Sequence, residues 1–434
     1  MKKLDICKLI ISSIRDFVST PDRLEAFRAP NFFVRRRKLS MLNVILFLLY
    51  NGKSALQSSI SSVRDLLYDV TGFPGKITKQ AISRARKGIS HALFLELFSL
   101  SSSIFYANLK ERKTWNGYHI FAIDGSKIEL PNSKDNFDYF GEMFEHHTPE
   151  RKYSQALVSV VYDVTEDYII HASCSRYLAS EREQAIKHMQ ELEELNIYED
   201  SIIIFDRGYY SERLFRYCAD HNHLCVMRLR DNYNLSKNVP RFKGKSIEHM
   251  DVLEGDAKEK TSDIPVRVIA VKLDTGETEY LATNIFDKNI TSDMFRELYF
   301  KRWPVESKYH ELKSTCLLEE FSGATANSII QEFYITLLIS NLSALIKEDA
   351  DEEITVKSRS TNKHRYQSNR TFIIGRIRIL LLRIISGTED ISILVTILED
   401  ACLTRSQILP GRKFKRDLKK QKKRSHFRNR KQSF

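Results

Sequence analysis

Hydrophobic residues recur at helical spacing through the first hundred or so positions of the chain. Apolar side chains follow the repeat of three to four residues that is typical of a helix over residues 4–18 and again over residues 39–50. A further helix is predicted after Thr78, which has the side chain of an N-cap and follows a turn rich in glycine and proline at residues 72–75. The N-terminal region is therefore predicted to be all helical.

From residue 118 the pattern changes to strands separated by helices. In chain order we expect strands at 118–130, 156–164 and 168–178, a helix at 181–195, a strand at 201–211, a helix at 211–221 and a strand at 224–230. Strands that alternate with helices in this way indicate an α/β domain. The sequence thus predicts a mixed sheet flanked by helices.

Residues 232–290 interrupt this arrangement. The stretch 238–256 is predicted to be irregular and polar, whereas residues 266–285 have the pattern of a hairpin around an Asp-Thr-Gly turn. We expect the interruption to be a mostly β insertion. Helices are predicted to follow it at roughly 328–346 and 370–386, which gives a helical C-terminal region.

Length and composition indicate a globular protein of two to four domains. The chain has 434 residues, of which 42% are hydrophobic and 29% are charged. Its longest apolar runs, residues 41–50 and 335–346, are too short to span a bilayer and fit buried helices, so no membrane partner is expected. Six scattered cysteines without a CxxC pair are typical of reduced core residues in a cytoplasmic protein.

The positive charge of the chain is concentrated at its C-terminus. The formal net charge is +12, and residues 411–434 alone contain 12 Lys or Arg and one Asp. Such a tail is usually disordered and attracts nucleic acid without reading its sequence. The tail therefore supports a nucleic-acid partner only weakly.

Basic residues also gather in the helical N-terminal region. They are Arg35, Arg36 and Arg37 in a connection between predicted helices, and Lys79, Arg84 and Arg86 on the helix after Thr78, which also carries the neutral amide Gln80. The segment resembles a helix-turn-helix, whose side chains meet phosphates or base edges. An ordinary basic face of a surface helix is an equal alternative.

Two aspartates follow apolar strand residues. Asp206 directly follows the continuous apolar run 202–205, which is typical of a strand buried on both faces, and Asp124 is expected at the end of its own strand. Ligands of α/β sheets bind at the carboxyl ends of strands. Carboxylates that cap helices or pair with arginine are common, so the shared placement of the two acids is a stronger indication than either alone.

The stretch YFKRWPVESKYHELK contains Tyr299, Arg302, Glu306 and Lys313 at helical spacing. On one continuous helix these side chains fall within a wedge of about 60°. Taken alone, this spacing is more typical of a solvated helix face. Pro304 indicates either a bend or the first turn of a second helix, and we predict a kink that keeps all four side chains on one site.

Together these segments resemble a DDE transposase of the insertion-sequence-four family. The acids Asp124, Asp206 and Glu306 occur in the family's order, and the Tyr-Arg-Glu-Lys spacing resembles its signature. The Asp-Arg-Gly-Tyr run at residues 206–209 and the β insertion before the glutamate also match. The resemblance covers about residues 120–345 and implies an RNase H-like fold.

The resemblance assigns the acids to metal-dependent chemistry. Asp124, Asp206 and Glu306 are expected to be the catalytic residues and to hold two Mg²⁺ ions, or Mn²⁺ in their place, because hard cations prefer carboxylate oxygens. Tyr299, Arg302 and Lys313 are expected to bind DNA phosphates near the transposon end. The intervening Trp303 is expected to pack the helix against the sheet.

The implied function is cut-and-paste DNA transposition in a prokaryotic cytoplasm. The enzyme would cleave double-stranded DNA at transposon ends and transfer the strands into target DNA, as a homodimer that pairs two ends. One alternative is a catalytically silent, transposon-derived DNA-binding protein, against which the intact acids argue. Another is a structure-selective nuclease of the same fold, against which the tyrosine, arginine and lysine around Glu306 argue.

The pattern predicts a division of the chain into six regions. They are a helical DNA-binding region at 1–115, the first part of the catalytic core at 116–231, the β-rich insertion at 232–290, the last part of the core with the Glu306 helix at 291–346, a C-terminal helical region at 347–410, and the basic tail at 411–434.

Overall fold

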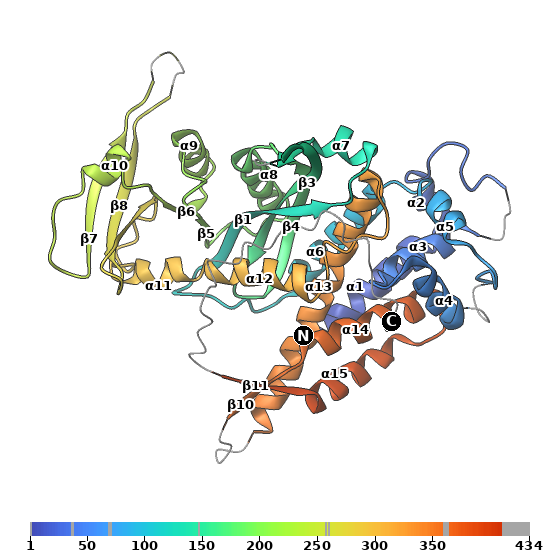
Figure 1. Cartoon of the computed structure of the whole chain (residues 1–434). Coiled ribbons are helices and arrows are strands. Elements are labelled where there is room, and N and C mark those ends of the chain that lie inside the picture. The colour runs from blue at the N-terminus through green and yellow to red at the C-terminus, as the bar shows by residue number, and fades with distance from the viewer. Residues whose placement is uncertain are drawn as a thin grey trace. The chain divides into compact units, whose positions relative to one another are not determined.

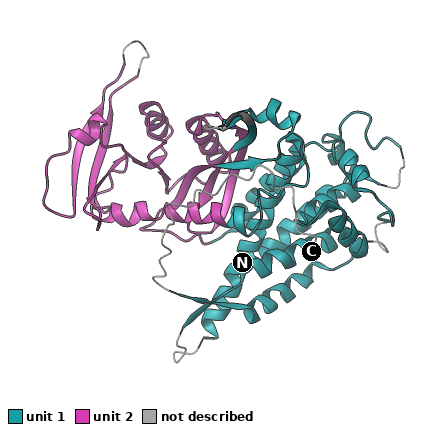
Figure 2. Ribbon diagram, in the orientation of Figure 1, with its two compact units in different colours: residues 1–110, 127–156, 311–434 teal, residues 111–126, 157–310 magenta. Residues whose placement is uncertain are grey.

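A computed structural model of the chain describes most of its residues and divides them into two compact units. It describes residues 2–35, 39–67, 72–145, 148–256, 258, 261–358 and 364–409. Figure 2 draws the helical unit, residues 1–110, 127–156 and 311–434, and the sheet unit, residues 111–126 and 157–310. Arg36, Arg37 and the basic tail, all expected above to meet nucleic acid, lie outside the described residues.

The helical unit is built around α13 (Ala326–Val356), whose side chains from Ser328 to Ile346 are all buried. The elements before it are α1 (Lys3–Val18), α2 (Pro21–Glu25), α3 (Met41–Tyr50), α4 (Leu56–Leu67), α5 (Lys79–Arg86), α6 (Ala92–Asn108), α7 (Lys134–Phe140) and β2 (Met143–Glu145). Those after it are β10 (Arg365–Ser368), α14 (Arg370–Ser386), the 3₁₀ helix Ile391–Ile393, α15 (Leu394–Leu403) and β11 (Arg405–Ile408). Helices α1, α6, α14 and α15 pack against α13.

Helix α13 is apolar all round because it is a core helix. Within the described residues it is the one helix long and apolar enough to cross a membrane, and its most apolar window is wholly buried in the protein.

The predicted helices at 4–18, 39–50 and 370–386 are confirmed, and the one at 328–346 is longer than predicted. All six cysteines lie in the described part of the chain and are free thiols.

Helix α5 begins where the sequence predicted it, because the Thr78 side chain accepts a hydrogen bond from the Ala81 amide at 3.2 Å. Of the connection that leads into α5, the structure describes residues 72–78, which form no helix or strand. The resemblance of this segment to a helix-turn-helix stays a prediction.

Arg86 anchors α5 to α13. Its Nη1 donates to Glu332 Oε1 at 3.1 Å, its Nε to Gln331 Oε1 at 3.0 Å, and its Nη2 to the Ser328 carbonyl at 3.1 Å. The side chains of Arg86 and Glu332 are each only 5% exposed. The expectation that Arg86 meets DNA is therefore wrong for this structure, because Arg86 lies one turn after the buried Ile82 and shares its inward face.

Replacing Arg86 with alanine is expected to lower the free energy of unfolding by about 3 kcal/mol, because the buried Glu332 carboxylate would lose its closest charged partner. Urea denaturation monitored by circular dichroism measures this change. The control is Arg84→Ala, which removes an exposed arginine two residues earlier and should change the free energy by about 0.5 kcal/mol or less. Equal effects of the two variants would show that the ion pair does not stabilise the fold.

The sheet unit contains most of a mixed sheet with strands in the order β3, β1, β5, β6, β9, β8, β7, in which β4 also pairs with β3. Strand β2 pairs with the first part of β3, which belongs to the helical unit. The strands are β1 (His119–Leu130), β3 (Thr148–Asp163), β4 (Tyr168–Arg176), β5 (Ser201–Phe205), β6 (Leu224–Arg228), β7 (Ser246–Leu253), β8 (Ile264–Lys272) and β9 (Thr278–Thr283). The helices are α8 (Glu181–Glu194), α9 (Glu212–Asp220), α10 (Asn234–Lys237), α11 (Met294–Phe300) and α12 (Trp303–Ser314), whose last residues belong to the helical unit.

Helices cover both faces of the central strands, as Figure 1 shows for α8 and α9 on one side and α11 on the other. Strand β5 is buried along its whole length, as its apolar run predicted. Phe295 and Leu298 of α11 pack in one cluster with Ile202 and Ile204 of β5. The order β4, β3, β1, β5, β6, in which β1, β5 and β6 are parallel, confirms the predicted RNase H-like α/β fold.

The insertion extends this sheet. Strand β9 pairs antiparallel with β6, and β8 and β9 form the predicted hairpin, in which Leu273 N donates to Glu277 O at 2.9 Å and Gly276 has a φ of +88°. The prediction of irregular structure at 238–256 is wrong for residues 246–253, which form β7. A strand at the edge of a sheet can be polar, and this one pairs with β8 along its full length.

Candidate active site

The two predicted aspartates come together through the pairing of β1 and β5. Strand β1 continues to Leu130, so Asp124 lies within its strand and not at its end. The parallel register pairs Ile123 with Phe205, and this is the last pair. Asp124 and Asp206 each directly follow this last pair along the chain. Because neighbouring strands of a sheet are about 4.8 Å apart, the two aspartates are close to one another.

Glu306 reaches the site from a separate helix. Helix α11 ends at Phe300 and α12 begins at Trp303, so Pro304 is a first-turn residue of a second helix. The predicted kink within one continuous helix is therefore wrong, and the other possibility raised by the sequence is the one that occurs. Proline fits there because the first-turn amides of a helix have no partner inside the helix.

Arg302 links two of the acids. Its Nη2 donates to Glu306 Oε1 at 2.8 Å, and its Nε lies 3.9 Å from Asp206 Oδ1. The Tyr299 hydroxyl donates to the same Asp206 oxygen at 3.2 Å. Tyr299 of α11 and Arg302, which lies between α11 and α12, therefore meet at Asp206, and Arg302 connects them to Glu306 of α12. That all four residues of the motif share one site stays a prediction.

Asp124 interacts electrostatically with Asp206 and Glu306. Burial raises the pKa of its carboxyl from 3.8 to about 7, and the negative charges of Asp206 and Glu306 add to this rise. The Gly125 amide, which donates to Asp124 Oδ1 at 2.9 Å, and the Arg302 guanidinium lower the pKa and partly offset the effect of burial. The three acids thus lie within electrostatic range of one another.

The two cations of the motif, Arg302 and Lys313, belong to different units of the protein. Arg302 is 3% exposed, and burial alone would lower its pKa, but Tyr299, Asp206 and Glu306 outweigh this effect and raise it. Its Nε is buried without a hydrogen-bond acceptor. Lys313 belongs to the helical unit, where its Nζ donates to the Lys127 carbonyl at 2.7 Å.

Trp303 does not have the packing role predicted for it. Its side chain is 44% exposed, beside the 57% exposed Phe300, with the two ring centroids 6.4 Å apart. The tryptophan that packs in the core is Trp115, which is 8% exposed and donates its indole N–H to Glu297 Oε1 at 2.8 Å. The spacing of the motif could not show this, because Trp303 begins its helix.

Two further acids border the cluster and were missed by the sequence analysis. Glu181 packs against Gly125, where a Cβ would lie 2.9 Å from the Glu181 carboxylate. Glu279 of β9 pairs with Arg228 at 3.1 Å, and burial raises its pKa. No sequence signal marks either acid, because each reaches the site only through the pairing or packing of its own element.

The acids have the chemistry of a site for hard divalent cations. Carboxylate oxygens are the ligands that Mg²⁺ and Mn²⁺ prefer, and Asp124, Asp206 and Glu306 supply them on one site. Within the described residues, however, no three His, Cys, Asp or Glu side chains are already close enough to form a metal site. Arg302 lies between Asp206 and Glu306, where its charge partly neutralises both, so the donor set fits a metal once Arg302 releases Glu306.

A chain of buried hydrogen bonds runs behind Asp124. Ser159 Oγ donates to the Asp124 carbonyl at 3.3 Å, His188 Nε2 lies 2.9 Å from Ser159 Oγ, and His188 Nδ1 lies 2.9 Å from His171 Nδ1. Because the serine has one proton, His188 must donate to it from Nε2 and accept at Nδ1 from His171. Both histidines are thus neutral. Burial lowers the pKa of His171 to about 4, and burial also lowers the pKa of His188 well below its ordinary value of 6.5.

This histidine pair is expected to make stability depend on pH. The folded state keeps both rings neutral, whereas the unfolded chain binds protons below about pH 6.5, so the free energy of unfolding should fall as the pH drops from 6.5 toward 4. The slope should be about 1 kcal/mol per pH unit for each histidine. His171→Asn should flatten this slope in urea denaturation across that range, whereas the exposed control His221→Asn should leave it as in the wild type. A wild-type slope in His171→Asn would contradict the proposed protonation states.

Comparison with known proteins identifies a family for the stretch of chain that carries these acids. The transposase DDE domain family matches residues 115–342, just over half of the chain, and this stretch contains all three acids. No curated protein matches the chain. Among solved structures, a cryo-EM structure of the piggyBac transposase synaptic complex with hairpin DNA is similar over 95% of this chain and 87% of that chain, with 12% identity and a TM-score of 0.48. The family match shows that this chain belongs to the transposase DDE domain family.

Proposed function

We propose that this chain is a cut-and-paste transposase of the insertion-sequence-four type, which cleaves double-stranded DNA at transposon ends and joins the strands to target DNA. The observation that carries the proposal is the meeting of Asp124, Asp206 and Glu306, which come from three distant segments of the chain. A purely structural set of acids would not need to gather beside the carboxyl end of β5, where the side chains of Asp206 and Glu306 are 40% and 36% exposed.

Two Mg²⁺ or Mn²⁺ ions are the proposed cofactors, held by these three carboxylates together with DNA phosphates and water. When bound, the ions neutralise charge on the attacking and leaving oxygens of the phosphodiester. The chain's own contribution is positioning. The β1–β5 register fixes the two aspartates, and the Tyr299 hydroxyl orients Asp206 through its hydrogen bond.

Arg302 is proposed to exchange partners when DNA binds. Its buried Nε–H has no acceptor, and a phosphate oxygen would satisfy it. Guanidinium groups bind phosphate in a bidentate way, so release of Glu306 by Arg302 would supply a carboxylate to the site and a donor pair to the DNA at once. Lys313 remains a proposed phosphate contact, as a point charge further along α12.

The cellular setting follows from this proposed reaction. The DNA substrate is the pair of inverted repeats that bound the element, and a homodimer would hold both ends while they are cut. The site of action is the cytoplasm of a prokaryotic host, on chromosomal DNA.

Substitution of the acids tests this function directly. Purified wild type should cleave labelled duplexes that carry the inverted repeats flanking its own coding sequence when Mg²⁺ or Mn²⁺ is present. Asp124→Asn, Asp206→Asn and Glu306→Gln should each reduce cleavage to background, because each removes a charged oxygen ligand. The matched control Glu212→Gln removes an exposed carboxylate of α9 and should cleave as the wild type does.

The products separate the competing functions. DNA binding without cleavage by the wild type would favour a silent DNA-binding protein. Cleaved ends that never appear joined to target DNA would favour a nuclease. Equal cleavage by the wild type and all three variants would show that the proposed acids are not catalytic.

Tyr309 is a positioning residue that the sequence analysis missed, although it lies inside the motif. It follows Glu306 by three residues on α12, so the two side chains are neighbours on one side of the helix. Its buried hydroxyl lies 2.8 Å from the Asp124 carbonyl, to which it donates, and 3.3 Å from the Val158 carbonyl. Tyr309 therefore ties the helix that carries Glu306 to the strand that carries Asp124.

Tyr309→Phe is expected to lower the cleavage rate about tenfold, because removal of the hydroxyl loosens the spacing between Asp124 and Glu306. The free energy of unfolding should fall by about 1 kcal/mol. The control Tyr118→Phe loses a hydrogen bond to Asp287 and should change only stability. Cleavage assays at several metal concentrations measure the effect, and equal rates for the two variants would rule out a positioning role.

A further inference from the structure

The first residue of α8 places a further carboxylate beside the candidate active site. This residue is Glu181, whose side chain is half-buried. A Cβ at Gly125 would lie 2.9 Å from Glu181 Oε1, and a Cβ at Gly208 would lie 3.8 Å from Glu181 Oε2. Gly125 directly follows Asp124, and Gly208 is two residues after Asp206. Each oxygen of Glu181 therefore lies beside a glycine that closely follows one of the two aspartates.

Glycine at residue 125 makes this approach possible. A Cβ there would meet the Glu181 carboxylate at a distance that real Cβ atoms almost never show, so the carboxylate would have to move. The turn after Asp206 also folds back tightly, because the Tyr209 amide donates to the Asp206 carbonyl at 3.1 Å. The backbone beside both aspartates is thus open to Glu181.

The charge of Glu181 is not paired with the arginine next to it. Arg182 Nε donates to the Tyr209 carbonyl at 3.1 Å, and Arg182 Nη2 donates to the Gly208 carbonyl at 3.2 Å. These bonds fix the start of α8 to the turn after Asp206. Among the residues that the structure describes, none forms a hydrogen bond or an ion pair with the Glu181 carboxylate. Its oxygens can therefore accept from a ligand.

A buried hydroxyl beside these acids also lacks a partner. Tyr209 is 1% exposed, and its hydroxyl lies near Ser159 without a hydrogen bond of ordinary geometry to any described residue. Burial raises the pKa of this tyrosine, and the charges of Asp124, Glu181 and Asp206 raise it further. The hydroxyl is thus within electrostatic range of all three acids. Buried polar groups without a protein partner commonly bind ordered water, so water has a place among these acids.

The pairing of Glu306 with Arg302 limits the carboxylates that are ready for a cation. Arg302 Nη2 donates to Glu306 at 2.8 Å, whereas Asp124 accepts only from the Gly125 amide at its Oδ1 among the described side-chain contacts. Mg²⁺ usually keeps several waters and takes one or two protein carboxylates directly. A further carboxylate can then act on the ion through those waters.

We propose that Glu181 is a fourth carboxylate of this site, which accepts hydrogen bonds from the water shell of a divalent ion held by Asp124 and Asp206. The inference rests on the proposed function for the presence of that ion. The added negative charge would strengthen the binding of the ion, and the accepted hydrogen bonds would orient its waters. Glu181 would act in this way before DNA binds, while Arg302 still holds Glu306.

A purely structural role is the alternative for Glu181. Negative side chains in the first turn of a helix stabilise it through the helix dipole. Glu181 and Glu183 both lie in the first turn of α8 and share this effect. Glu183, however, is exposed and does not approach either glycine. Glu183 is therefore a matched control for the helix dipole.

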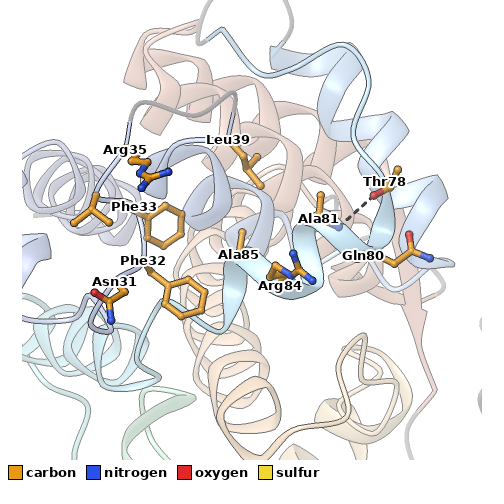
Figure 3. Close-up of a pocket in the computed structure, with 11 residues that line it drawn as sticks. Asn31, Phe32, Phe33, Arg35, Leu39, Thr78, Gln80, Ala81, Arg84 and Ala85 are labelled. Carbon is orange, nitrogen blue, oxygen red and sulfur yellow. Dashed lines mark hydrogen bonds between the residues drawn. The ribbon is translucent and has the colours of Figure 1, made fainter.

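Two hollows of the helical unit are poor rivals for a divalent cation. The groove of about 830 Å³ beside α5, shown in Figure 3, is lined by Arg35 and Arg84 and, among the described residues, by no carboxylate. A second hollow of about 730 Å³ contains Asp135 together with Arg28 and Lys87. The Asp135 carboxylate already accepts from the first amide of α13 at 2.6 Å. The acids of the sheet unit are thus the better place for the ion.

Titration of Mn²⁺ into the full chain without DNA tests the proposal, with free Mn²⁺ measured by electron paramagnetic resonance. Glu181→Gln should weaken Mn²⁺ binding about tenfold, because it removes a charged acceptor for the metal-bound water. Glu183→Gln should bind Mn²⁺ as the wild type does. Asp124→Asn should lose this binding, which locates the ion at the site. Thermal melting of each variant confirms that it is folded.

The metal dependence of DNA cleavage gives a second measurement. The Mg²⁺ concentration for half-maximal cleavage should rise about tenfold in Glu181→Gln, and saturating Mg²⁺ should restore the rate to within about twofold of the wild type. Glu183→Gln should follow the wild-type curve. A purely structural defect would instead lower the rate equally at every Mg²⁺ concentration.

The outcomes separate this inference from the proposed function. Equal Mn²⁺ affinity of folded Glu181→Gln and the wild type would overturn the inference, even if the wild type cleaves DNA. Equal weakening by Glu181→Gln and Glu183→Gln would also overturn it, because the helix dipole would then be the cause. Mn²⁺ binding that persists in Asp124→Asn would place the ion elsewhere and do the same. If Mn²⁺ binding depends on Glu181 but the wild type never cleaves, the metal site stands and the transposase reaction does not.

Discussion

The parallel pairing of β1 with β5 is the constraint on which the site depends. Hydrogen bonds between the strands fix their register, and the last pair, Ile123 with Phe205, leaves Asp124 and Asp206 side by side. A shift of one residue would turn one aspartate to the opposite face of the sheet. Burial of β5 on both faces makes such a shift costly, because every side chain of the strand would change its surroundings.

Gathering three carboxylates creates an electrostatic cost that the protein offsets locally. Burial is the largest cause of the raised pKa of Asp124, and the negative charges of Asp206 and Glu306 add to it because like charges disfavour one another's ionisation. Arg302 supplies the compensating charge through its contacts with Asp206 and Glu306. The Tyr309 hydroxyl of α12 donates a hydrogen bond to the Asp124 carbonyl of β1, which connects the helix of Glu306 to the strand of Asp124 without adding a charge.

A buried pair of an arginine and a carboxylate also occurs in the helical unit, where it connects α5 to α13. Arg86 and Glu332 form a buried ion pair surrounded by hydrogen bonds, so an arginine that looked like a surface residue is part of the core. The other polar residues of α5, Lys79, Gln80, Ser83 and Arg84, are exposed. Each unit thus contains a buried arginine that pairs with acidic side chains.

The sequence by itself determined most of the secondary-structure elements and pointed to the acids of the candidate site. Periodicity located α1 and α3, turn residues located the hairpin of β8 and β9, and the family resemblance pointed to Asp124, Asp206 and Glu306, because these signals are local. Only the tertiary structure decided that Arg86 is buried, that Trp303 is exposed and that Glu279 borders the acids. Helical spacing records which side chains share a face, but the partner of that face is set by packing between residues far apart in the chain.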